Sequence, residues 1–215
     1  MASRRIARHD WFAMRLICEE VLDSMANTQR LSHLQIRALC EGAIMIALAQ
    51  ALSYVKLYEL PNGGSLTPAM FPILLYALRW GLGRGLGAGF VFGLLQLIFD
   101  GAYAWGWQSM LLDYLVAFTP LGLAGLFRGK AWGIFPGTVL GCAARFVVHY
   151  ISGVTIYKIY EPTEVPGLGT FSSPALYSLV YNGSYMLPNM LLALAIAAVL
   201  YVPLKKYYAG KDILA

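Results

Sequence analysis

Long apolar stretches separated by short breaks constrain this sequence more than any other feature. We identify six such stretches along the 215-residue chain, at positions 38–58, 68–80, 85–101, 107–127, 131–157 and 174–203. The breaks are rich in glycine, proline and polar residues, as in "LPNGGSLTP" and "EPTEVPGLGTFSSP", which is typical of loops. Because a helix needs about 20 apolar residues to cross a bilayer, the pattern predicts an all-α integral membrane protein built as a bundle of six transmembrane helices.

The composition also indicates a membrane protein without a second globular domain. Hydrophobic residues make up 59% of the chain and charged residues 13%, whereas soluble domains are about 45–50% apolar and about 25% charged. We therefore expect one membrane domain at 37–208 and a short cytoplasmic tail at 209–215. Residues 1–36 are polar and show no signal peptide. They form either a helix on the membrane surface or a poorly ordered extension.

The distribution of charge predicts the orientation of the bundle. Cations gather after the second and fourth stretches and beyond the sixth, at Arg79, Arg84, Arg128, Lys130, Lys205, Lys206 and Lys211. The other connections carry the acidic residues Glu59, Asp100, Glu161 and Glu164. Since basic loops stay on the cytoplasmic side, both termini are expected to be cytoplasmic. The net charge of +5 is thus explained by topology and does not indicate a nucleic-acid partner.

Glycine recurs at every fourth position around the third stretch. Gly81, Gly85, Gly89 and Gly93 would form one smooth stripe along a helix. Small residues let helix backbones approach closely in lipid, so we expect this stripe to pack inside the bundle.

Alanine forms a similar row in the first stretch, at Ala43, Ala47 and Ala51. From the residues alone, this flat face either packs inside the bundle or docks another membrane protein.

The sequence contains no motif that predicts catalysis, metal binding or ATP hydrolysis. GxSxG, HExxH and the phosphate-binding GxxxxGK[ST] are all absent. The cysteines, Cys18, Cys40 and Cys142, are scattered, so we expect buried thiols and no metal site. An intramembrane enzyme that uses His149 and Asp113 is an alternative that none of these motifs supports.

Polar residues nevertheless interrupt the apolar stretches at matching depths. In "RFVVHYISGVTIY", Arg145, His149, Gly153 and Tyr157 recur every four residues and share one side of a helix. Asp113 lies about two turns into the fourth stretch, where a carboxylate needs a partner or a function. Asp113 and Arg145 would neutralise one another in the simplest interpretation.

Further polar and aromatic residues lie toward the same end of the bundle. Tyr103 precedes the fourth stretch, and Tyr177 and Asn182 begin the sixth. Single aromatic residues there are typical of the membrane interface. Together, an acid, a histidine, an asparagine and several aromatic rings predict a pocket for a small, flat ligand that is cationic or rich in nitrogen.

Five segments of the chain carry a resemblance to a known family: "EGAIMIALAQAL", "FPILLYALRWGLGRGLGAG", "LLDYLVAFTPLGLAGLF", "ARFVVHYISGV" and "YSLVYNGSYMLPN". Over residues 36–208 the sequence resembles the thiamine-specific substrate-binding subunit of energy-coupling-factor vitamin importers. The resemblance implies six helices with both termini inside and a thiamine pocket near the outer surface, formed by the last three helices.

The resemblance also implies which residues bind thiamine. The matching positions are Asp113, Tyr103, His149, Gly153, Tyr157, Tyr177 and Asn182, with Arg145 holding the acid in place. The sequence departs from the family where Asp113 replaces the frequent glutamate and Tyr157 the frequent tryptophan. In the first outer loop, Tyr58 is only a loose substitute for the aromatic residue that the family has there.

The family further implies partners for this chain. The alanine row would dock the transmembrane coupling subunit, two ATP-binding subunits would supply energy, and the whole subunit would topple to release thiamine inside. No cofactor is expected, and the chain would be a multi-pass protein of a bacterial cell membrane. Alternatives are the same fold with another vitamin, such as riboflavin or a thiamine precursor, and a stand-alone structural or sensory membrane protein.

Overall fold

A computed structural model describes residues 20, 33–60, 64–99, 106–160, 164–165 and 167–214. The chain divides into two units, Met1–Cys40 and Glu41–Ala215. Most of the predicted N-terminal extension lies outside the described residues. In the first unit the structure describes only Glu20 and residues 33–40, all of them helical. The second unit contains the bundle.

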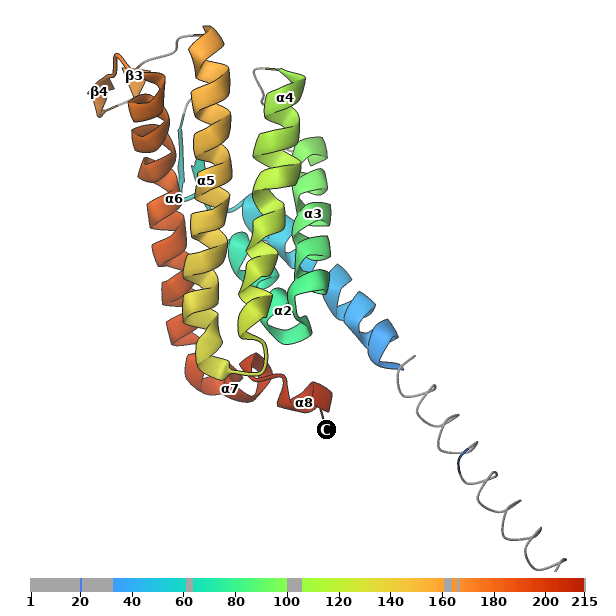
Figure 1. Ribbon diagram of the computed structural model, residues 1–215. Helices are drawn as coiled ribbons and strands as arrows, with labels where there is room; N and C mark the ends of the chain where they lie inside the picture. The colour runs from blue at the N-terminus through green and yellow to red at the C-terminus, as the bar shows by residue number, and fades with distance from the viewer. Residues whose placement is uncertain are drawn as a thin grey trace, which may run out of the picture. The chain divides into compact units, whose positions relative to one another are not determined.

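Helices dominate the second unit (Figure 1). In the described part of the chain, five helices are long and apolar enough to cross a membrane: His33–Ser53, Leu82–Phe99, Trp107–Phe127, Ala131–Ile156 and Pro174–Val199. Another apolar helix, α2 (Met70–Trp80), is shorter, with 11 residues. It corresponds to the stretch at 68–80, the shortest of those in the sequence. The prediction of an all-α membrane protein is confirmed.

Three of the long helices carry the labels α3 (Leu82–Phe99), α5 (Ile134–Tyr160) and α6 (Pro174–Val199). The Trp107–Phe127 helix comprises α4 (Trp107–Met110), the π-helix η1 (Leu111–Val116) and the 3₁₀ helix η2 (Thr119–Phe127). The 3₁₀ helix η3 (Ala131–Gly133) precedes α5, and α7 (Tyr201–Tyr208) and α8 (Lys211–Leu214) follow α6. Two antiparallel hairpins pair β1 (Tyr58–Glu59) with β2 (Ser65–Leu66) and β3 (Glu164–Val165) with β4 (Gly169–Thr170). Figure 1 places α7 and α8 at the end of the bundle opposite α4 and the β3–β4 hairpin.

The glycine stripe packs inside the bundle, as predicted, but only three of its four members lie in a helix. Gly81 adopts φ +91° between α2 and α3 and ends α2, because a left-handed backbone suits glycine. In α3, a Cβ added at Gly89 or Gly93 would lie 2.5 Å from a carbonyl oxygen of Phe118 or Tyr114. These glycines therefore let α3 touch the backbone of the fourth helical segment.

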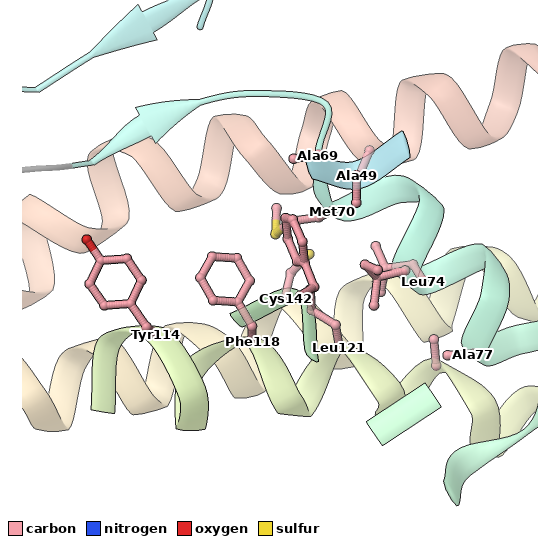
Figure 2. Packing of buried hydrophobic residues seen from close by; sticks show 13 residues of the cluster. Ala49, Ala69, Met70, Leu74, Ala77, Tyr114, Phe118, Leu121 and Cys142 are labelled. Atoms are coloured by element: carbon pink, nitrogen blue, oxygen red, sulfur yellow. The ribbon is translucent and has the colours of Figure 1, made fainter. Parts of the chain in front are cut away.

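The main apolar cluster lies between α2, α3 and the fourth helical segment. Figure 2 shows Tyr114, Phe118 and Leu121 along that segment, with Leu121 near Leu74 of α2. The rings of Phe118 and Phe92 meet edge to face, with centroids 5.0 Å apart, which is a favoured aromatic geometry. Several members of this cluster, namely Ala69, Met70, Phe92, Tyr114 and Phe118, also line the cavity described below.

Candidate functional site

A cavity of about 130 Å³ lies between the β1–β2 hairpin and the helices. Its apolar and aromatic lining includes Met70, Phe92, Tyr114, Phe118, Ile156, Tyr181 and Tyr185. Its polar lining includes Gln96, Ser109, Asp113, Arg145, His149, Ser152, Asn182 and Asn189. Apolar walls with a few placed polar groups are typical of a site for a small molecule.

Asp113 lies in this cavity on a π-helical turn, and both of its carboxylate oxygens are hydrogen-bonded. Ser109 Oγ donates to Asp113 Oδ2 at 2.6 Å, and Ser152 Oγ donates to the same oxygen at 2.9 Å. The other oxygen, Oδ1, lies 3.0 Å from His149 Nδ1. The turn is the π-helix η1, and such turns are rare and frequent at functional sites.

His149 connects Asp113 to Arg145. Arg145 Nε donates to His149 Nε2 at 3.4 Å. Since an arginine can only donate, Nε2 is the acceptor, and the ring proton belongs on Nδ1, which faces Asp113. His149 in this arrangement is the neutral tautomer, donating to a carboxylate. Within the described residues Arg145 makes no direct ion pair with Asp113. The two charged groups are linked by way of His149, which lies between them.

The guanidinium of Arg145 rests on an aromatic face. Its central carbon lies 3.9 Å from the centroid of the Phe118 ring, a cation–π geometry. Arg145 and His149 are one helical turn apart on α5, as the spacing of four predicted.

Asn182 is bonded to protein on both sides of its amide. Its Nδ2 donates to the Ser178 carbonyl oxygen at 3.0 Å and approaches the Ser178 hydroxyl at 3.1 Å. Its Oδ1 accepts a hydrogen bond from the Tyr185 hydroxyl at 3.0 Å. Asn182 therefore fixes the orientation of Tyr185, an aromatic wall of the cavity.

Gly153 lies at a close contact between α5 and α6 beside the cavity. A Cβ at this position would lie 2.2 Å from Ser178 Oγ, closer than two such atoms can sit. The glycine is needed for the contact between the two helices that brings His149 and Asn182 to one site.

Tyr177 is fully buried and does not line the cavity. Its ring stacks on Tyr181, with centroids 5.6 Å apart and planes 13° from parallel. Tyr181 does line the cavity, so Tyr177 supports an aromatic wall from behind.

The β1–β2 hairpin is fastened to α6 beside the cavity. Asn189 Nδ2 donates to the Ser65 carbonyl oxygen at 2.7 Å, and Asn189 Oδ1 accepts from the Thr67 backbone N–H at 3.0 Å. A Cβ at Gly64 would lie 2.5 Å from the Tyr185 ring. Tyr58, on β1, is exposed and does not line the cavity.

Comparisons with known proteins show the family to which the chain belongs. The model of a family described as "Thiamine transporter protein (Thia_YuaJ)" matches residues 39–209. The chain belongs to this thiamine transporter family. The resemblance over residues 36–208 is thereby confirmed.

Relatives of this thiamine transporter family member come from other bacteria. A protein named thiamine transporter ThiT of Bacillus subtilis is 31% identical and covers 78% of this chain and 92% of its own length. One of the same name from Lacticaseibacillus paracasei is 33% identical and covers 84% and 94%. A solved structure of ThiT from Listeria monocytogenes has a TM-score of 0.70 at 25% identity and covers 81% of this chain and 98% of that one. The chain is a multi-pass protein of the bacterial cell membrane.

The structure of this chain places several of the predicted site residues in the cavity, but not all of them. Asp113, His149, Gly153, Asn182 and Arg145 all line the cavity. Tyr103 and the side chain of Tyr157 lie outside what the structure describes. No group of histidine, cysteine and acidic residues suited to a metal ion occurs among the described residues.

The alanine row does not pack inside the bundle. Ala43, Ala47 and Ala51 are all exposed on the His33–Ser53 helix, as are the neighbouring Ile44 and Leu48. Of the two interpretations of this row, internal packing is wrong.

Reasoning from sequence missed several residues of the cavity, among them the polar side chains of Ser109, Ser152, Gln96 and Asn189. Gln96 and Asn189 are amides within apolar stretches, which is a signal that a sequence search for polar residues in membrane helices would find. Serines are common in membrane helices and give no such signal.

Proposed function

We propose that this chain binds thiamine in the cavity beside Asp113 and serves as the substrate-binding subunit of an energy-coupling-factor importer. The observation that carries the proposal is a hydrogen-bonded carboxylate inside an aromatic cavity, in a family described as thiamine transporters. Relatives that are named transporters favour a carrier over an enzyme.

The chemistry of thiamine suits this cavity. Thiamine joins two flat rings, an aminopyrimidine and a positively charged thiazolium. Phe118, Tyr181 and Tyr185 supply aromatic faces, and such faces attract both flat rings and organic cations. Asp113 accepts a hydrogen bond from an N–H of the aminopyrimidine, and its negative charge favours the thiazolium.

Other residues complete the proposed site. We propose that His149 and Asn182 contact the ligand at the cavity wall and hold Asp113 and Tyr185 in position through their own hydrogen bonds. Gly153 keeps α5 and α6 close enough to share the cavity. Further contacts that we propose from the resemblance are Tyr103, Tyr157 and, acting through Tyr181, Tyr177. Arg145 supports the acid through His149.

The alanine row is the proposed docking face for the transmembrane coupling subunit. Ala43, Ala47 and Ala51 leave a flat, exposed strip on an apolar helix, and small residues allow close helix packing in lipid. The chain lacks a phosphate-binding motif, and the resemblance to the importer family implies that two ATP-binding subunits provide the energy. With both termini cytoplasmic, toppling of the docked subunit would carry the cavity from the outer side to the inner side.

Equilibrium binding of thiamine to the detergent-purified chain tests the ligand. A panel of thiamine, riboflavin and a thiamine precursor is titrated against the intrinsic tryptophan fluorescence. We expect saturable quenching by thiamine at the lowest concentration of the three. No response to thiamine, with strong quenching by riboflavin, would refute the proposal.

Copurification with the coupling module tests the docking face. Replacing Ala47 by Leu puts a bulky side chain on the strip and should reduce recovery of the coupling and ATP-binding subunits, while thiamine binding to the isolated chain is unchanged. Gly83→Leu is a matched control, because a Cβ at Gly83 meets nothing within 4 Å. Equal recovery with Ala47→Leu and with wild type would remove the strip from the interface.

A further inference from the structure

We propose that Ser109 and Ser152 are positioning residues that hold the Asp113 carboxylate in its ligand-binding orientation. This inference rests on the proposed function, since it concerns the same cavity. Both serines are almost completely buried, at 4% and 1% exposed, and both hydroxyls donate to a single oxygen, Asp113 Oδ2.

The two serines reach Asp113 from different helices. Ser109 lies on α4, four residues before Asp113, and its donation spans the start of the π-helical turn. Ser152 lies on α5, three residues after His149, so the two side chains share one face of that helix. The carboxylate is therefore held along its own segment and across the bundle, which fixes both its rotation and its depth.

The donors leave little of the carboxylate unoccupied. Two carboxylate oxygens offer about four acceptor positions. Ser109 and Ser152 use those of Oδ2, and His149 uses one on Oδ1. Within the described residues, one position on Oδ1 remains for a ligand, so Asp113 is built to accept one further N–H. This arrangement also explains how a short aspartate serves in place of a longer acid, because its position is fixed from three sides.

Hydroxyls in this bundle usually behave differently. Thr119 Oγ1 donates to the Leu115 carbonyl oxygen at 2.7 Å, and Thr155 Oγ1 donates to that of Ile151 at 2.9 Å, as hydroxyls within helices commonly do. Ser109 and Ser152 instead turn to a carboxylate on the cavity wall. The hydroxyls of Ser109 and Ser152 therefore donate to a side chain of the cavity, and not to a backbone carbonyl oxygen one turn earlier in their own helix.

The test is thiamine binding to Ser109→Ala, Ser152→Ala and the double variant, in the full-length detergent-purified chain. Each single change should weaken binding about tenfold, since it removes a hydrogen bond to a charged group. Thr155→Val is the matched control: it removes a hydroxyl from α5 that does not reach Asp113, and it should bind as wild type does.

A double-mutant cycle separates positioning from general structural support. If the serines act through Asp113, replacing them by alanine in an Asp113→Asn background should lower thiamine affinity by less than about twofold. The reason is that the effects of coupled residues are not additive. Equal losses in both backgrounds, or a loss with Thr155→Val as large as with Ser152→Ala, would overturn the inference. A wild-type chain that does not bind thiamine overturns the proposed function and this inference with it. A wild-type chain that binds while the serine variants bind equally well overturns this inference alone.

Discussion

Two arginines enclosed by the same bundle are paired in opposite ways. Arg79, at the end of α2, is 1% exposed, and its N–H groups meet both carboxylate oxygens of Glu41, both of Asp212 and the carbonyl oxygen of Tyr207. The guanidinium of Arg145, on the cavity wall, has a single long hydrogen bond within the described part of the chain, to His149 at 3.4 Å. We call the first cluster, Arg79 with Glu41, Tyr207 and Asp212, the complete site, because its guanidinium is fully hydrogen-bonded. We call Arg145 and His149 the incomplete site.

The complete site joins segments that are distant in the chain. Glu41 belongs to the His33–Ser53 helix, Tyr207 to α7 and Asp212 to α8. A guanidinium has five N–H groups, and the guanidinium of Arg79 makes five hydrogen bonds, four to carboxylate oxygens and one to a carbonyl oxygen, at 2.5 to 3.1 Å. With no donor left for a ligand, this cluster holds α7 and α8 against the end of the bundle.

The incomplete site lies on the wall of the cavity in which we propose that thiamine binds. Arg145 rests on Phe118 with most of its N–H groups directed to no acceptor among the described residues. Natural proteins depart from full polar pairing chiefly at functional sites. The difference between the two arginines therefore separates the part of the bundle that we expect to provide stability from the part that we propose binds the ligand.

The largest expected effect comes from removing the complete site. Arg79→Met takes away the shared partner of Glu41 and Asp212 and should lower the free energy of unfolding by about 3 kcal/mol, the lower end of the cost of breaking a buried ion pair. The lower end applies because the Asp212 side chain is 36% exposed. Denaturant unfolding of the ligand-free chain in detergent measures the change.

Arg84→Met is the control for that prediction. Arg84 is exposed, and its guanidinium lies 5.1 Å from the Trp80 ring centroid, so its loss should cost less than about 1 kcal/mol. If the two variants unfold alike, the network around Arg79 does not stabilise the bundle.

The second effect concerns binding rather than folding. Asp113→Asn should weaken thiamine binding at least about tenfold, because the charge and one acceptor oxygen are lost, while the protein still folds. Equilibrium binding and unfolding are measured on the same preparation. Unchanged affinity would remove Asp113 from the site. A loss of stability as large as with Arg79→Met would instead make Asp113 part of a structural network.

The comparison also shows what could be predicted from the sequence. Apolar length predicted the membrane helices, and a spacing of four placed Arg145 and His149 on one side of α5. A carboxylate within an apolar stretch identified Asp113. These inferences succeed because helix periodicity and the cost of burying charge are local properties of the chain.

Other features depend on contacts that no local pattern encodes. Arg79 was interpreted only as a marker of a cytoplasmic loop, whereas its partners lie 38 and 133 residues away. Gly81 has the spacing of the glycine stripe but ends a helix. The hydrogen bond from Ser152 to Asp113 likewise joins α5 to the fourth segment, across 39 residues of sequence.

The smallest expected effect, and the one that tests the comparison most directly, is that of Arg145→Met. Exchanging a poorly paired cation for an apolar side chain of similar length often leaves stability unchanged, so we expect the free energy of unfolding to change by less than about 1 kcal/mol. Thiamine affinity should fall by less than with Asp113→Asn, because Arg145 reaches Asp113 only through His149. Unfolding and binding are again measured together, with Arg79→Met alongside. If Arg145→Met destabilises the chain as much as Arg79→Met does, both arginines are structural, and incomplete pairing does not identify the binding site.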